Sequence, residues 1–142
     1  MGLVLPRVLI GLTSMCFPNH LDIHSQVLKS AHSMMQELAS ASGSPYNYKN
    51  KCMLLEAEMF SSRFEDTKAR QAYTESIQAS INSGFIHEQG LAEELFGKHC
   101  LRFGDRHGAL QYFRQALQCY KLWGCQLKVD SIQNAIDKMD SN

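Results

Sequence analysis

His87 and Glu88 come closest to a catalytic signature, at the start of the stretch FIHEQGLAEELFG. In the zinc signature HExxH, two histidines one helical turn apart bind the metal, and the glutamate acts as general base. The position four residues after His87 is Leu91, so the second histidine is missing, and Gly90 interrupts the helix that would carry it. An acidic residue shortly after Gly84 is instead typical of a helix start, where it favours the positive end of the helix dipole. The sequence therefore predicts no zinc site here.

The remaining histidines do not complete a site with any cysteine. His20, His24 and His32 can share one helix face, but no fourth ligand is spaced to join them, so we expect surface histidines. His99 and Cys100 are adjacent, so their side chains point to different sides of a helix and cannot simply form a nucleophile–base pair. A small cysteine- or metal-dependent hydrolase remains the alternative to a chain without catalytic activity and without a cofactor.

Composition limits the compartment and the partners. Fourteen basic residues balance fourteen acidic ones, so no charge excess favours nucleic acid as a partner. The number of cysteines is odd and no CxxC occurs, which indicates free thiols in a reducing compartment and predicts a cytoplasmic protein. The five cysteines are Cys16, Cys52, Cys100, Cys119 and Cys125.

Residues 1–20 are apolar but are interrupted by Pro6 and Arg7. A membrane-spanning helix needs about 20 consecutive apolar residues, so no integral membrane segment is expected. The stretch also lacks the basic region that begins a signal peptide. We interpret it as a partial N-terminal helix or an apolar leader. Its apolar surface would be covered if the segment folds back on the following helix, pairs with a second copy or contacts another protein.

Apolar residues recur at helical spacing through the rest of the chain, and no alternating run is long enough for a strand. The fold class is therefore predicted as all-α. Helix-breaking residues such as Pro45, Gly84 and Gly124 separate the periodic segments. The six predicted helices cover approximately residues 21–40, 48–62, 65–82, 87–102, 106–122 and 126–139.

A repeat of forty residues runs through these helices. It aligns a helix-breaking glycine, an acidic turn residue, a small alanine and an aromatic residue. Such a repeat predicts stacked helical hairpins, because each hairpin has an apolar face that it cannot bury alone. We expect residues 21–140 to form an α-solenoid of tetratricopeptide-like hairpins with a C-terminal capping helix. The aligned pairs are Phe60 with Cys100, Glu65 with Asp105, Ala69 with Ala109, Tyr73 with Phe113, Ile77 with Leu117, and Gly84 with Gly124.

Two stretches, NYKNKCMLLEAEM and INSGFIHEQGLAEELFGKHCLRFGDRHGALQYFRQALQCYKLWGCQLKV, closely resemble the tetratricopeptide-like helical region of large multidomain signalling proteins. In that family the region follows a STAND/AAA-type ATPase module, often behind a serine/threonine kinase-like domain. It usually precedes a GAF domain and a sensor histidine kinase. The resemblance runs from about residue 46 to residue 132. It departs at Asn50, where the family has His, and at Gly90 and Cys125, where the family has Ala.

The resemblance implies a non-catalytic protein–protein interaction scaffold, because the chemistry of the family lies in other domains. It would relay signals between an ATPase module and the histidine kinase output of a two-component system. Its partners would be other protein domains or a second copy of itself. In a tetratricopeptide hairpin the first helix lines the concave face, which places a candidate binding face there. The alternative for that face is an ordinary solvated helix surface with a Glu94–Lys98 pair. The candidate residues are Glu94, Lys98 and Arg102, with Lys51, Glu58 and Ser62 one repeat earlier.

Overall fold

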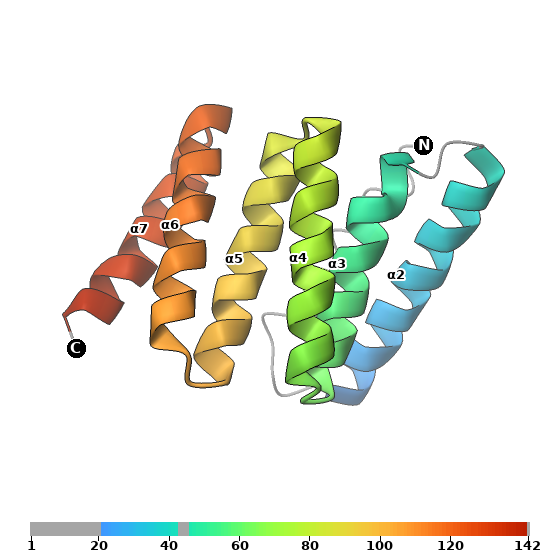
Figure 1. The fold of residues 1–142 in the computed structure, drawn as a ribbon, viewed down its shortest axis with the longest axis horizontal. Coiled ribbons are helices and arrows are strands. Elements are labelled where there is room, and N and C mark those ends of the chain that lie inside the picture. Colours follow the sequence, from blue (N-terminus) through green and yellow to red (C-terminus); the bar gives the residue numbers. More distant parts are fainter. Residues whose placement is uncertain (1–20, 43–45, 142) are drawn as a thin grey trace. The chain divides into compact units, whose positions relative to one another are not determined.

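The described part of the computed structural model, residues 21–42 and 46–141, is all-α and contains no strand. Each helix begins and ends within two residues of the predicted bounds. The predictions for residues 1–20 lie outside the described residues. No helix within the described residues is long and apolar enough to cross a membrane. The helices are α2 (Leu21–Ser42), α3 (Tyr46–Ser62), α4 (Asp66–Ser83), α5 (Ile86–Arg102), α6 (Arg106–Trp123) and α7 (Gln126–Asp140) (Figure 1).

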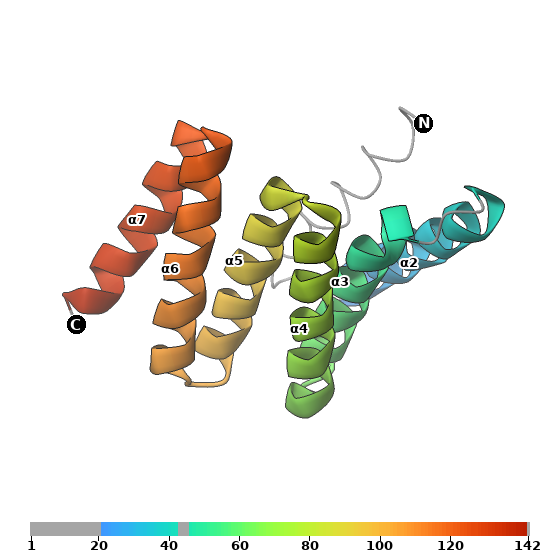
Figure 2. The same cartoon turned by 45° about the horizontal axis from the view of Figure 1, so that its top comes forward.

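The chain divides into two compact units, residues 1–72 and 73–142, and the boundary falls within α4. In the first unit, α2 packs against α3. Where the side chains of α2 are described, the buried apolar residues are Leu28, Ala31 and Met35, whose spacing of three and four residues places them on one helix face. In the second unit, α5, α6 and α7 lie side by side (Figures 1 and 2).

Two kinds of turn alternate along the chain. After α3 and after α5, a residue with positive φ precedes the next helix: Phe64 at 60° and Gly104 at 77°. After α4 and after α6, the residues with positive φ are Gly84 at 73° and Gly124 at 85°. The members of each pair are forty residues apart. The five helices from α3 to α7 accordingly begin at intervals of twenty residues, at positions 46, 66, 86, 106 and 126.

Two glycines of α5 lie close against side chains of α6. A Cβ atom at Gly97 would lie 2.7 Å from ring carbons of Phe113, and one at Gly90 would lie 3.0 Å from the ring of Tyr120. Both rings are almost completely buried. Glycine costs about 1 kcal/mol relative to alanine inside a helix. At these two positions the cost is offset because the absent side chain lets a ring of α6 pack directly on the backbone of α5.

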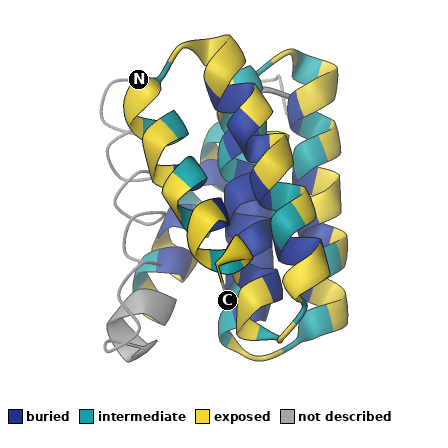
Figure 3. Cartoon of the chain, turned by 90° about the vertical axis from the view of Figure 1, so that its left-hand side faces the viewer, coloured by how far each residue is buried: buried dark blue, intermediate teal, exposed yellow. Residues whose placement is uncertain are grey.

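A row of stacked rings continues this core from α4 across α5 to α6. Tyr73 and Phe96 stack with their ring centroids 5.0 Å apart, and Phe96 stacks on Tyr112 at 3.9 Å. Tyr73 and Phe113 are buried, as are Ala69 and Ala109 at the preceding turn of each helix. In Figure 3 the buried residues lie where helices face each other, and the outward faces around the C-terminal helix are exposed.

Candidate functional site

His87 and Glu88 lie in the first turn of α5, as predicted. The helix begins at Ile86, and Glu88 is the acidic residue of its first turn. The exposed imidazole of His87 lies against the indole of Trp123, with ring centroids 5.3 Å apart. His87 is thus part of a surface ring pair between α5 and the end of α6.

Two other histidines that the structure describes, His32 and His99, are covered to different extents. His32 was expected at the surface, but it is half-buried, and its Nε2 lies 3.5 Å from a carboxylate oxygen of Glu56 on α3. His99 is fully buried, with its ring centroid 4.6 Å from that of Phe103 and 5.4 Å from that of Tyr73. His20 and the side chain of His24 lie outside the described residues. Within the described chain, no group of three His, Cys, Asp or Glu residues is arranged to hold a metal ion.

The half of the candidate binding face that lies on α3 is mostly covered. Glu58 is buried, with only 2% of its surface exposed. Lys51 is half-buried, and its Nζ lies 6.0 Å from the ring centroid of Tyr48. Ser62 is half-buried, and its hydroxyl donates to the carbonyl oxygen of Met59 at 2.8 Å. Glu58 therefore does not present its carboxylate to solvent.

The half on α5 turns from the interior to the surface along the helix. Glu94 is only 4% exposed, whereas Lys98 and Arg102 are exposed. Residues four apart on an α-helix are rotated by about 40°, so a row at i, i+4 and i+8 drifts around the helix. Here the drift carries the row from beneath α6 and α7 into solvent. The exposed members of the candidate face on α5 are thus Lys98 and Arg102.

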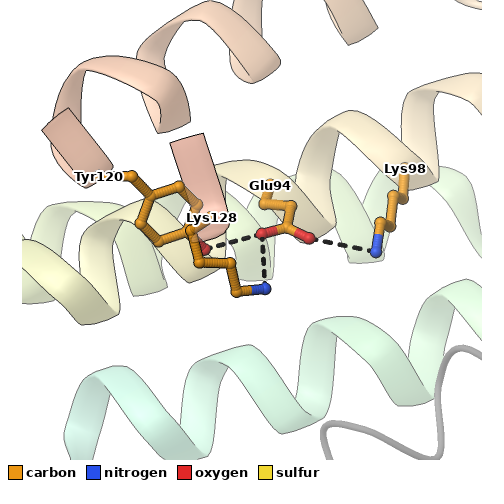
Figure 4. Close-up of polar contacts among 4 residues, drawn as sticks. All are labelled: Glu94, Lys98, Tyr120 and Lys128. Atoms are coloured by element: carbon orange, nitrogen blue, oxygen red, sulfur yellow. Dashed lines mark hydrogen bonds and ion pairs between the residues drawn. The ribbon is translucent and has the colours of Figure 1, made fainter. Parts of the chain in front are cut away.

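The buried carboxylate of Glu94 joins three helices (Figure 4). The Tyr120 hydroxyl on α6 donates to Glu94 Oε1 at 2.7 Å, and Lys128 Nζ on α7 lies 3.3 Å from the same oxygen. Lys98 Nζ, one turn along α5, lies 3.2 Å from Oε2. Lys128 Nζ also lies 5.6 Å from the ring centroid of Tyr120. We call these four residues the Glu94 cluster.

The Glu94 cluster favours the ionised carboxylate. Burial by itself raises the pKa of Glu94, but the charges of Lys98 and Lys128 and the Tyr120 hydrogen bond outweigh it, so the pKa is lowered. The pKa of Tyr120 is raised strongly, first by burial and then by the Glu94 charge beside it. The phenol thus remains a hydrogen-bond donor to a carboxylate throughout the neutral pH range.

The adjacent Glu93 has the opposite electrostatics. Its Oε2 accepts from the Cys119 thiol at 3.2 Å, and its Oε1 accepts from Gln89 Nε2 at 3.1 Å. Cations do not contribute to the shift at this carboxylate, and burial dominates, so the pKa of Glu93 is raised. Burial and the neighbouring Glu93 raise the pKa of Cys119 to about 12. Two consecutive glutamates of α5 therefore meet consecutive residues of α6 with pKa values shifted in opposite directions.

This arrangement joins helices and does not lower the pKa of a thiol. A nucleophilic cysteine needs a lowered pKa so that the thiolate is populated near neutral pH. Cys119 has its pKa raised to about 12, and burial raises that of Cys52 to about 11. The Glu94 cluster, in contrast, ties Lys128 of α7 to α5 and α6 through a charged hydrogen-bond network.

Comparison with known proteins adds no relative from which a role could be transferred. No protein-family model matches the chain, and neither a curated protein nor a solved structure does.

Proposed function

We propose that the chain is a non-catalytic protein–protein interaction scaffold, an α-solenoid of tetratricopeptide-like hairpins with α7 as its capping helix. One observation supports this above all: the turns recur every forty residues and the helices begin every twenty, from α3 to α7. Such regularity is typical of repeat proteins, which use extended surfaces for binding. α7 suits a cap because it buries only Ile132 and Ile136 and most of its exposed residues are polar, with Leu127 as an exposed apolar residue.

The proposed role within a signalling protein follows the sequence resemblance. The scaffold would relay between a STAND/AAA-type ATPase module and a histidine kinase output in the cytoplasm. Lys98 and Arg102 are the residues of the candidate face on α5 that are exposed for such contacts. The rival proposal of a cysteine-dependent hydrolase finds no support in Cys52 and Cys119, whose raised pKa values keep both thiols protonated.

Binding to purified modules tests this proposal. The chain is titrated into the ATPase module and into the histidine kinase module of a protein that carries the resembled region. We expect saturable binding to at least one module, weakened by the double change Lys98→Gln and Arg102→Gln. The matched control is Lys29→Gln with Lys49→Gln, which removes two exposed positive charges from α2 and α3.

Absence of binding to both modules would refute the proposed relay. Equal loss of binding in the test and control variants would show that charge alone, and not the α5 face, mediates the contact. Turnover of ester or peptide substrates that is abolished by Cys119→Ala or Cys52→Ala would favour the hydrolase instead.

A further inference from the structure

Among the helices that the structure describes, α6 stands out because all its charges have one sign. It carries Arg106, Arg114 and Lys121 and no aspartate or glutamate, in a chain with equal numbers of basic and acidic residues. Each of the other described helices contains at least one acidic residue. The cationic character is therefore local to α6.

Two of the three charges of α6, those of Arg114 and Lys121, fall on one exposed row of the helix, whereas Arg106 donates to the carbonyl oxygen of Met139 on α7. The side packed on α5 carries buried residues such as Ala109, Phe113 and Tyr120. The opposite side carries residues at i, i+4, i+7, i+11, i+14 and i+15, which a helix of 3.6 residues per turn aligns in one row. All of them are exposed, and we call them the α6 stripe: His107, Gln111, Arg114, Gln118, Lys121 and Leu122.

Glutamines on the other helices of the second unit are bonded to a residue one turn away. Gln78, Gln89, Gln126 and Gln133 each donate to the side chain four residues on, at 2.8–3.1 Å. Three of these four acceptors are carboxylates. The amides of these helices thus have local partners.

The glutamines of the α6 stripe have no carboxylate four residues away. The residues four positions from Gln111 are His107 and Gln115, and those four positions from Gln118 are Arg114 and Leu122. Within the described structure, the side chains of Gln111, Arg114, Gln118 and Lys121 take part in no hydrogen bond or ion pair.

Most acidic groups on the neighbouring segments have partners, whereas Asp140, the last residue of α7, is exposed. The Asp105 carboxylate accepts from the backbone N–H of Gly108 at the start of α6. On α7, Asp130 and Asp137 accept from glutamines of the same helix. Glu94 is enclosed in its cluster. Among the acidic residues that the structure describes in the second unit, none forms an ion pair with Arg114 or Lys121.

An apolar group completes the α6 stripe at its C-terminal end. Leu122 is 75% exposed, although leucine side chains are usually buried. The next residue, Trp123, is half exposed. The row of cations and amides thus ends in an apolar group, so that charge can steer a partner and Leu122 can make an apolar contact with it.

We propose that the α6 stripe docks an acidic helical segment of a partner protein. Arg114 and Lys121 lie two turns apart and match carboxylates at the same spacing on the partner, and Leu122 matches an apolar residue at one end. The stripe spans fifteen residue steps, or about 22 Å, so the segment is about four turns long. This inference rests on the proposed scaffold function and adds to it the chemistry of the partner and the helix that binds it.

A designed peptide tests the proposal with the whole chain. The probe is a helical peptide of about 16 residues with glutamates at i, i+4, i+7 and i+11 and a leucine one turn further on. Binding is measured by fluorescence anisotropy at low and at physiological salt. We expect saturable binding that weakens at least about tenfold in the double variant Arg114→Glu with Lys121→Glu. The control Lys29→Glu with Lys49→Glu makes the same change in net charge and should leave binding within about twofold.

Several outcomes would overturn the proposal. One is equal loss in both double variants, and another is undiminished binding of a peptide with the same composition but scrambled glutamate positions. Tighter binding of a single-stranded polynucleotide than of the peptide would identify the α6 stripe as a nucleic-acid surface instead. The variant Arg114→Gln with Lys121→Gln, together with circular dichroism, separates loss of binding from loss of folding. If the peptide does not bind but the signalling modules still do, the docking role of the α6 stripe is refuted and the scaffold proposal is not.

Discussion

Glu93 and Glu94 are neighbours in sequence but experience opposite electrostatic environments. Glu94 has two lysines and a phenol around its carboxylate, which lower its pKa. Glu93 has a thiol and an amide, and burial raises its pKa. The difference arises because consecutive helical residues point about 100° apart, so one side chain reaches Lys128 on α7 and the other does not.

Isosteric changes at these two positions should change stability in opposite directions. Glu94→Gln removes the charge that Lys98, Lys128 and Tyr120 share, so we expect the free energy of unfolding at pH 7 to fall by about 2–3 kcal/mol. Glu93→Gln removes a buried charge without a cation beside it, so we expect a gain of about 1 kcal/mol. Urea denaturation followed by circular dichroism measures both, and each variant is the control for the other.

The pH dependence of the two variants follows from the direction of each shift. The lowered pKa of Glu94 stabilises the folded state above the ordinary pKa of 4.5, and this contribution is lost as the pH falls through the folded value. The raised pKa of Glu93 gives a contribution that is present below 4.5 and lost as the pH rises through the folded value. Both differences from wild type should therefore shrink in acid. A Glu93→Gln effect that grows as the pH falls would contradict this account.

Phe64 has a strained backbone conformation whose effect on stability can be measured. It is 78% exposed and has φ of 60°, a left-handed conformation that costs a non-glycine residue about 1–2 kcal/mol. Its counterpart forty residues later is Gly104, with φ of 77°. We expect Phe64→Gly to raise the free energy of unfolding by about 0.5 kcal/mol, because relief of strain exceeds the added entropy of the unfolded chain. Gly104→Ala should lower it by about 1 kcal/mol, and the melting temperature reports both. A lower melting temperature in Phe64→Gly would mean that contacts of the ring outweigh the strain.

At the scale of the element, the helices were predictable and the environment of their polar side chains was not. Apolar spacing and helix-breaking residues are local signals, so they defined all six helices to within two residues. The partners of Glu94 on other helices are Tyr120 and Lys128, which are 26 and 34 residues away. Spacing at i, i+4 and i+8 places residues in a row along a helix, but it cannot indicate where along that row a neighbouring helix covers it. Gly90 and Gly97 were the available signal of close helix contact.

Substitution of these two glycines should affect stability differently, because one of them contacts α6 more tightly. Gly97→Ala places a methyl group 2.7 Å from the buried ring of Phe113, so the packing must shift. We expect a loss of about 1–2 kcal/mol after the gain in helix propensity. Gly90→Ala meets Tyr120 and Cys119 at 3.0–3.2 Å, where a small adjustment suffices, and should be within about 0.5 kcal/mol of wild type. In the Gly97→Ala background, Phe113→Leu should cost less than it does alone. Equal losses at both glycines would contradict the assignment of Gly97 as the tighter contact.

At the scale of the whole molecule, buried cysteines can report whether stability is local or shared. Cys52 lies in the first compact unit, and Cys100 and Cys119 lie in the second; all three are buried. Cys125 is only half-buried and should react with an alkylating reagent without opening of the fold. In a repeat array, stability is approximately a sum of repeat and nearest-neighbour contributions, so a local defect opens mainly its own region.

Native-state alkylation in the two compact units therefore tests the proposed repeat architecture. In Gly97→Ala, the protection of Cys100 and Cys119 from iodoacetamide should fall by about tenfold for each 1.4 kcal/mol lost, whereas that of Cys52 should fall by less than about threefold. The mirror variant is Leu55→Ala, which removes a fully buried side chain of α3 and should expose Cys52 more than Cys100. The alkylation rate of each cysteine is compared with the rate of the same cysteine in the wild type, so differences in thiol pKa between sites cancel. If each variant exposes all three cysteines equally, the molecule unfolds as one cooperative core, and the repeat-array proposal fails.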